Sequence, residues 1–261
     1  MSETTHSTRD GAVLTLTINR PEALNALNPP TMRALRDGIE AAGRDREIGA
    51  VVLTGSGRAF CSGADLKDVA ARLDTGEMDV GNDLRANYVP LTRAIRFCPK
   101  PVIAALNGSA AGAGLSLALA CDLRIAAAGA QLIVAFVRVG LVPDAGCLFF
   151  LTRMVGLSKA TELALSGDPL SVEAAQQLGL VAAVVPPDQL MSVALERARR
   201  LAEGPRQTTA LIKRGLERAL DLDLEQVMEL EAQLQTLAAR TADAQEAIRA
   251  FIEKRTPVFR A

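Results

Sequence analysis

Three short segments of this sequence carry residues whose types and spacing could do chemistry. The first is residues 107–114 (NGSAAGAG), which lead from a predicted strand into an apolar helix. The first amides of such a helix have no intrahelical acceptor, the helix dipole favours negative charge there, and small side chains let a ligand reach the backbone. The segment therefore indicates either an oxyanion or phosphate site, or tight packing of a helix against a strand.

The second segment, residues 58–67 (RAFCSGADLK), follows another predicted strand. Gly63 could turn the chain and expose the amide of Ala64, and we interpret Asp65 as the cap of a short helix. Two amides from separate loops have the geometry that an oxyanion hole needs. Each such amide stabilises a transition state by about 3–4 kcal/mol.

The third segment is residues 140–146 (GLVPDAG), which place Asp144 on a turn at the start of a predicted helix, between apolar runs. One interpretation is an aspartate that caps the helix, and the segment taken alone favours it. The other interpretation is a partly desolvated carboxylate, whose raised pKa would suit it to move protons.

The composition narrows the possible chemistry. His6 is the single histidine among the 261 residues, which argues against a histidine-based triad, a Cys–His dyad and a histidine-ligated metal site. The formal net charge of −1 gives no field that would attract nucleic acid or an anionic membrane. No apolar run reaches the roughly 20 residues of a membrane-spanning helix. The four cysteines show no paired spacing, so we expect reduced thiols, a cytoplasmic protein and no bound metal.

Two more specific motifs are incomplete. A dinucleotide-binding fingerprint would need a glycine where the chain has Leu117. Residues 114–118 (GLSLA) partly resemble a nucleophile elbow, but they lack its last glycine, and no histidine is available to serve Ser116. We therefore do not predict Ser116 as a nucleophile.

The elements that must position these segments alternate between strand and helix, which predicts an α/β architecture. Apolar runs bounded by turn residues predict strands at 12–18, 50–53, 102–106, 122–127 and 181–184. Helical periodicity and stop signals predict helices at 31–42, 84–97, 115–120, 146–155, 158–166 and 171–178.

The chain also has a predicted division along its length. We expect a disordered tail at 1–10, an α/β core at 11–200 that holds the site, and a helical region at 201–261. Within the core, the acidic stretch 72–83 is predicted to be a mobile loop. An apolar stripe along the helical region indicates that it covers its own core or a neighbouring chain; the stripe consists of Leu224, Val227, Leu230, Leu234 and Leu237.

Taken together, the motifs resemble those of the enoyl-CoA hydratase/isomerase, or crotonase, superfamily over essentially the whole chain. The stretches that carry the resemblance are 19–27 (NRPEALNAL), 51–66 (VVLTGSGRAFCSGADL), 100–126 (KPVIAALNGSAAGAGLSLALACDLRIA), 140–146 (GLVPDAG), 171–185 (SVEAAQQLGLVAAVV) and 250–259 (AFIEKRTPVF).

The resemblance implies a crotonase fold, which is a spiral of ββα units followed by C-terminal helices, assembled as a homotrimer or a dimer of trimers. It implies an acyl-CoA substrate whose thioester oxygen lies between the amides of Ala64 and Ala113. Coenzyme A would enter as part of the substrate, without a separate cofactor. Arg20, Lys67 and Lys254 are candidates for its phosphates. The residues expected to contact the substrate or coenzyme A are Ser62, Gly63, Asp65, Leu66, Lys67, Gly112 and Phe136.

The carboxylates indicate which reaction the chain catalyses. Hydratases of the superfamily use two glutamates, whose places fall at Ser116 and Phe136 in this chain. Losing a general acid–base group costs about 10²–10⁴ in rate, so water addition is disfavoured. Asp144 falls where some members carry their only catalytic carboxylate, and its segment looks most like isomerases that act on the ring epoxide of phenylacetyl-CoA. The resemblance thus favours catalysis by Asp144 and an isomerase that transfers a proton through a thioester enolate, and so either shifts a double bond from the 3 to the 2 position of an enoyl-CoA or opens a ring epoxide.

Three alternatives compete with the isomerase. An enoyl-CoA hydratase is the chief one, in spite of Ser116 and Phe136. A halobenzoyl-CoA dehalogenase would use Asp144 as a nucleophile but needs a histidine base, which His6 is poorly placed to supply. A non-catalytic, RNA-associated relative is disfavoured by the near-neutral charge.

Overall fold

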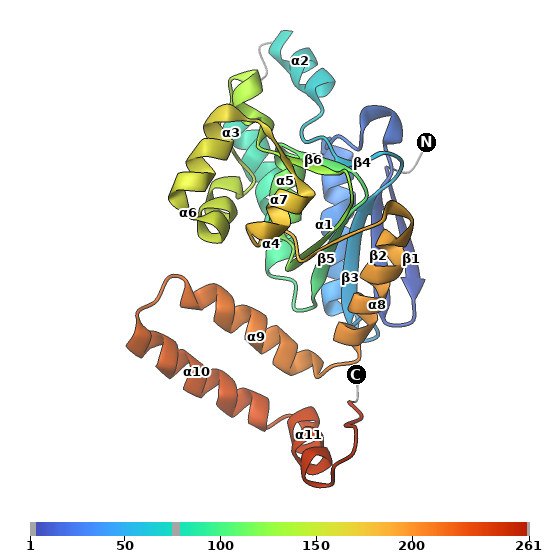
Figure 1. Cartoon of the computed structure of the whole chain (residues 1–261), viewed down its shortest axis with the longest axis vertical. Helices are drawn as coiled ribbons and strands as arrows, with labels where there is room; N and C mark the ends of the chain where they lie inside the picture. The colour runs from blue at the N-terminus through green and yellow to red at the C-terminus, as the bar shows by residue number, and fades with distance from the viewer. Residues whose placement is uncertain (1–3, 75–78, 260–261) are drawn as a thin grey trace.

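The computed structural model describes residues 4–74 and 79–259 (Figure 1). Six strands form the larger sheet, in which every neighbouring pair is parallel except the first. Strands β3 and β5 are buried at every residue, as continuous apolar runs in a parallel sheet require. In spatial order the strands are β1 (Thr5–Asp10), β2 (Val13–Ile18), β3 (Ala50–Gly55), β5 (Val102–Leu106), β7 (Leu123–Ala127) and β10 (Ala183–Val185).

A second sheet consists of four short strands, and three of them directly follow strands of the larger sheet along the chain. Strand β3 is followed by β4 (Ala59–Cys61), β5 by β6 (Ser109–Ala111) and β7 by β8 (Gln131–Ile133), and β9 (Pro169–Ser171) pairs with β8. Each pair of strands then leads into a helix, which produces the expected ββα spiral. The chemical segments around Ala64, Ala113 and Asp144 follow β4, β6 and β8, so the spiral gathers them at one end of the second sheet.

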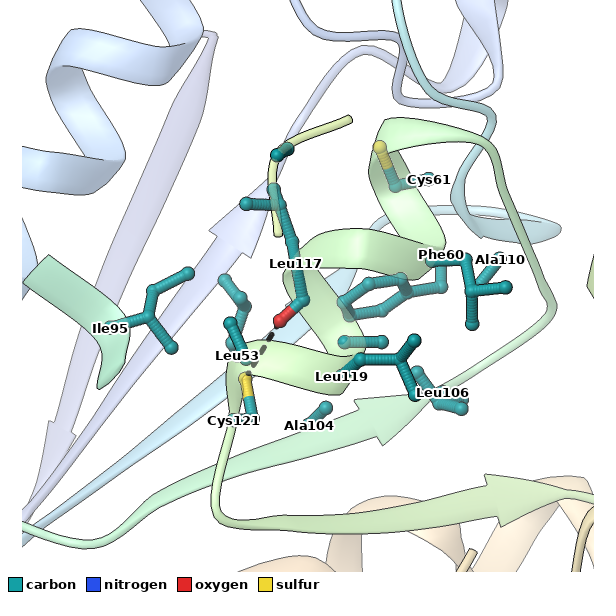
Figure 2. Packing of buried hydrophobic residues seen from close by; sticks show 14 of the residues in the cluster. Leu53, Phe60, Cys61, Ile95, Ala104, Leu106, Ala110, Leu117, Leu119 and Cys121 are labelled. Atoms are coloured by element: carbon teal, nitrogen blue, oxygen red, sulfur yellow. Dashed lines mark hydrogen bonds between the residues drawn. The ribbon is translucent and has the colours of Figure 1, made fainter. Parts of the chain in front are cut away.

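Helices cover both faces of the larger sheet. On one face α1 (Pro29–Arg44), α4 (Val89–Arg96) and α5 (Ala113–Ala120) enclose the main core. Every residue of α5 is buried, and Figure 2 shows its Leu117 and Leu119 packed among Leu53, Phe60 and Leu106. On the other face lies α8 (Leu190–Ala202), whose alanines, spaced four residues apart, let the helix approach the strands closely.

Shorter elements link these layers. A 3-10 helix η1 (Pro21–Ala23) precedes α1, and η3 (Ala135–Val139) follows β8. Helix α6 is kinked at Gly156, whose φ of 75° separates the two predicted helices 146–155 and 158–166. The remaining elements are α2 (Leu66–Asp74), α3 (Val80–Asp83), the π-helical turn η2 (Leu84–Tyr88), α6 (Cys147–Ser166), α7 (Val172–Gln177) and the 3-10 helix η4 (Pro187–Gln189).

Three helices form an arm that projects from the core (Figure 1): α9 (Arg206–Ala219), α10 (Leu224–Ala239) and α11 (Ala242–Ile252). Ion pairs connect the arm to the core at Lys213 and Glu217, on one side of α9, and at Asp221, just after this helix. Many apolar side chains of the arm are exposed, for example Leu216 at 68% and Phe251 at 86%. No helix in the described part of the chain is both long and apolar enough to cross a membrane.

Two sequence-based expectations are wrong. Residues Thr5–Asp10 of the predicted tail form β1, which pairs antiparallel with β2 from Thr5 opposite Ile18 to Asp10 opposite Val13. Asp10 also forms an ion pair with Arg199 of α8, so contacts distant in sequence order this polar strand. The predicted loop at 72–83 is helical at both ends, in α2 and α3, while its residues 75–78 lie outside the described part.

Candidate active site

Asp144 lies on a tight turn between η3 and α6. The turn continues through Ala145 and Gly146, whose φ angles of 49° and 87° are both left-handed. The side chain of Asp144 makes no capping hydrogen bond with α6, whose N-cap is Gly146. The backbone carbonyl of Asp144 accepts from the Cys147 amide at 2.8 Å instead. The capping interpretation of the Asp144 carboxylate is therefore wrong.

Hydroxyl groups from two helices bind the backbone of this turn. Ser116 Oγ of α5 donates to the Asp144 carbonyl at 2.9 Å, and Thr92 Oγ1 of α4 donates to the Ala145 carbonyl at 3.1 Å. Sequence reasoning did not identify either contact. The only signal was a polar residue, Ser116, within the otherwise apolar run of α5.

The Asp144 carboxyl group is held in a largely apolar setting. Its Oδ1 atom is buried and has no hydrogen-bond partner within the described residues. Burial raises the pKa of Asp144 to about 6, and the nearby charge of Asp83 on α3 adds to the increase. A carboxylate with this pKa is ionised at neutral pH but is a stronger base than an ordinary aspartate, so it is suited to proton transfer.

The amide of Ala64 points away from the neighbouring segment that contains Leu27. Gly63 and Asp65 both bond to Leu27, the first through its carbonyl (2.7 Å) and the second through its amide (3.0 Å). Because successive residues of an extended chain direct their backbone groups to opposite sides, the Ala64 amide faces the other way.

The loop that carries Ala64 contacts the start of α5. A Cβ atom added at Gly63 would lie 2.9 Å from the Ala111 carbonyl oxygen and 3.2 Å from the Ala113 nitrogen. Ala113 is the first residue of α5, so its amide has no intrahelical acceptor. At Gly114 an added Cβ would lie 2.3 Å from the Cys61 carbonyl oxygen. Small residues therefore serve tight packing here, and the same packing brings the Ala64 and Ala113 loops together.

The other residues expected to contact the substrate occupy varied positions. Ser62, Gly63 and Gly112 belong to the two touching loops, whereas Leu66 and Lys67 are exposed at the start of α2. Phe136, another of these expected contacts, is buried in η3 and packs in the main core. Asp65 is described below.

Asp65 has a structural partner in Arg20. The carboxylate bonds Arg20 at 2.7 Å, and its other oxygen accepts from the Lys67 amide at 3.2 Å, in agreement with the predicted cap of a short helix. Burial would raise the pKa of Asp65, but the bond and charge of Arg20 outweigh it and lower this pKa. Arg20 also donates to the Ala26 carbonyl at 2.6 Å, so its guanidinium is occupied within the fold.

Lys254 and Lys67 lie far apart within one chain, so they do not form a single phosphate site there. Lys254 follows α11, at the opposite end of the molecule from α2 (Figure 1). Among the described residues, no three histidine, cysteine, aspartate or glutamate side chains gather as a metal site would require. The four cysteines are free and buried.

Comparisons with known proteins identify the family of the chain. The chain matches the enoyl-CoA hydratase/isomerase family over residues 8–261. It is 41% identical to the 1,2-epoxyphenylacetyl-CoA isomerase of Escherichia coli K12, over 95% of this chain and 94% of that protein. It is 39% identical to the 2,3-dehydroadipyl-CoA hydratase of the same organism, over 97% of this chain and 96% of that protein.

Solved structures give the same answer for the fold. The crystal structure of an enoyl-CoA hydratase from Polaromonas sp. JS666 has a TM-score of 0.94 and 36% sequence identity, covering 98% of this chain and 99% of that one. The expected crotonase fold is thereby confirmed. Together with the spiral and the match over nearly the full length, these findings show that the chain belongs to the enoyl-CoA hydratase/isomerase, or crotonase, family.

Proposed function

We propose that this enzyme is an acyl-CoA isomerase in which Asp144 is the single proton-transfer carboxylate. The observation that carries the proposal is the half-buried Asp144 carboxyl, whose Oδ1 has no partner among the described residues and whose pKa is raised to about 6 by burial and by Asp83. It stands on a turn bonded directly to α5, the helix that begins with the Ala113 amide.

The proposed reaction moves one proton between two carbons of the acyl group. Asp144 removes a proton from C2 of a 3-enoyl-CoA, and the electron pair passes to the thioester oxygen to give a dienolate. The Ala64 and Ala113 amides donate hydrogen bonds to this oxygen as its charge develops. Asp144 then returns the proton to C4, which leaves the double bond between C2 and C3. Atoms and charge balance without a second base.

Ser116 and Phe136 support isomerisation over hydration. Ser116 is fully buried and bonded to backbone, and Phe136 is buried among apolar residues. Neither provides a carboxylate to activate water. The 39% identity to a hydratase keeps water addition as the second candidate.

Similarity to the 1,2-epoxyphenylacetyl-CoA isomerase at 41% identity supports a ring epoxide of phenylacetyl-CoA as a second substrate.

The exposed apolar residues of the arm support a homotrimer or a dimer of trimers. Sedimentation equilibrium tests the assembly, because we expect a mass of three or six chains.

Mass-resolved product analysis with a 3-enoyl-CoA tests the reaction. We expect the wild-type enzyme to form a 2-enoyl product of unchanged mass, and Asp144→Asn, which keeps the side-chain size, to lose about 10²–10⁴ in rate. A product heavier by one water, formed equally by both proteins, would overturn the isomerase proposal and place hydration first. Turnover of the epoxide by wild type but not by Asp144→Asn would add the second substrate.

A further inference from the structure

The turn that carries Asp144 is intrinsically unfavourable. Ala145 has a φ of 49°, and the left-handed conformation costs a residue with a side chain about 1 kcal/mol. Gly146 follows with a φ of 87°, where a Cβ atom would lie 2.8 Å from the Phe150 ring. Two consecutive left-handed residues need outside contacts to keep one conformation.

Two hydroxyl groups supply those contacts at consecutive carbonyls. Ser116 has 0% exposure, and its Oγ lies 2.9 Å from the Asp144 carbonyl oxygen and 3.3 Å from that of Gly112. A hydroxyl donates one proton, and the shorter distance favours the Asp144 carbonyl. Thr92 Oγ1 donates to the next carbonyl, that of Ala145, at 3.1 Å.

The bond from Ser116 also joins two parts of the proposed mechanism. Ser116 follows Ala113 by three residues on α5, and its amide bonds the Gly112 carbonyl at 3.1 Å in the first turn of that helix. One helical turn thus connects the amide proposed to stabilise the enolate with the backbone of the proposed base.

We propose that Ser116 and Thr92 are positioning residues, whose hydroxyls lock the Asp144–Ala145 carbonyls and hold the Asp144 carboxylate at a fixed place relative to the Ala113 amide. This inference rests on the proposed function of Asp144. At the place where hydratases of the family carry a glutamate, this chain would use Ser116 as an anchor for a base supplied by another segment.

The charged surroundings of Asp144 make its titration a direct measure of this anchoring. The charge of Asp83 on α3 acts on Asp144, and Asp144 in turn acts on Cys147 of α6. The pKa of the Cys147 thiol is raised to about 11, chiefly by burial, although a hydrogen bond with Ser116 lowers it. Helices α5 and α4 present the uncharged hydroxyls of Ser116 and Thr92 to the turn. If the turn loosens, the carboxylate gains water and its pKa falls towards the ordinary value.

The test combines ¹³C-carboxyl NMR titration of aspartate-labelled protein with steady-state kinetics on a 3-enoyl-CoA. The Asp144 signal is assigned by its absence in Asp144→Asn. We expect Ser116→Ala and Thr92→Val to lower the Asp144 pKa by about one unit. We also expect them to reduce kcat about tenfold to a hundredfold, with little change in KM, because misplacement by about 1 Å has effects of this size. Thr92→Ser, which keeps the hydroxyl, should retain wild-type values.

Thr54→Val is the matched control. It removes another buried hydroxyl, which donates to the Ala105 carbonyl at 2.8 Å between β3 and β5. An equal stability loss in this variant, without a change in kcat or in the Asp144 titration, supports the anchor. If Ser116→Ala does not fold, the Thr92→Val and Thr92→Ser pair decides.

The inference is overturned if Asp144 titrates as in wild type in both hydroxyl-deletion variants and kcat falls no more than in Thr54→Val. An isomerase-inactive wild type would remove the proposed function instead. In that case the NMR titration alone still decides whether the two hydroxyls fix the carboxylate.

Discussion

The Asp144 site and the helical arm are held in opposite ways. At the site, short bonds from hydroxyls to carbonyls and close contacts at glycines join segments within an apolar core. The arm meets the core through ion pairs on and just after α9 and leaves many apolar side chains exposed.

Because of this difference, substitutions in the two regions should affect different properties of the enzyme. The proposed reaction depends on where the backbone groups of the site lie, and misplacement by about 1 Å can change a rate about 10²-fold, so small steric changes should act on the rate. The arm depends on charge pairing with the core and, we propose, on burial against other chains. Changes there should act first on stability and assembly.

After the loss of the Asp144 carboxylate itself, the largest expected effect is steric, at Gly63. Gly63→Ala would place a Cβ atom 2.9 Å from the Ala111 carbonyl oxygen, on a residue with φ of 98°. We expect the Ala64 amide to be displaced and kcat to fall about 10²–10³-fold, the loss typical of one oxyanion donor.

Gly129→Ala is its matched control, since Gly129 has a φ of 85° but nothing within 4 Å of an added Cβ. It carries the same backbone strain without the clash. Equal losses of kcat in the two variants would mean that strain, and not the position of Ala64, sets the rate.

The second prediction concerns pH. Because the ionised form of Asp144 is the proposed base, kcat/KM should rise about tenfold per pH unit up to a pH of about 6, its raised pKa, and then level off. A pH–rate profile between pH 4.5 and 8 measures this. A profile without an inflection near that pH would contradict Asp144 as the base.

Stability should follow the opposite trend over this range. The folded pKa of Asp144 lies above its unfolded value of about 3.8, so the folded state binds more protons between these pH values. The free energy of unfolding therefore decreases as pH rises from about 4 to about 6. Asp144→Asn should remove this contribution and be the more stable protein above pH 6, as thermal melts can show.

The smallest effect on the rate is expected in the arm. Lys213 Nζ lies 2.5 Å from Asp122 Oδ2 and 2.8 Å from the Lys100 carbonyl oxygen, with both charged side chains mostly buried. Lys213→Met should lower the free energy of unfolding by about 3 kcal/mol while kcat per folded chain changes little.

The comparison variant is Lys159→Met, which removes the more exposed pair with Glu162 on α6. This change should cost about 0.3–0.5 kcal/mol, measured by urea unfolding. Equal losses in the two variants would show that α9 is not held by its ionic contacts.

Most of the fold could be predicted from local patterns. The predicted strand 102–106 coincides with β5, and predicted helix 31–42 lies within α1, because apolar periodicity and turn residues act locally. Strand β1 was missed because its sequence THSTRD has no apolar face. Its order comes from the register with β2 and from Arg199, which is 189 residues away from Asp10.

The sequence named the parts of the candidate site but not the connections between them. Motif resemblance predicted Ala64, Ala113 and Asp144 as site residues, and the structure places them on segments that follow neighbouring strands. The bond from Ser116 to the Asp144 carbonyl, 28 residues away, depends on how α5 packs. Asp83 was hidden in a segment predicted to be a loop, so its effect on the pKa of Asp144 could not be foreseen.

The bridge between Leu27 and Ala64 has a consequence for how such a site can change over time. Ala64 would contribute only its backbone, and the direction of that backbone follows from its place between two residues that bond Leu27. Replacing the methyl group at position 64 would leave the direction intact, whereas inserting or deleting one residue between Cys61 and Ala64 would reverse it. In this loop, we therefore expect the number of residues to vary less among related chains than their identity.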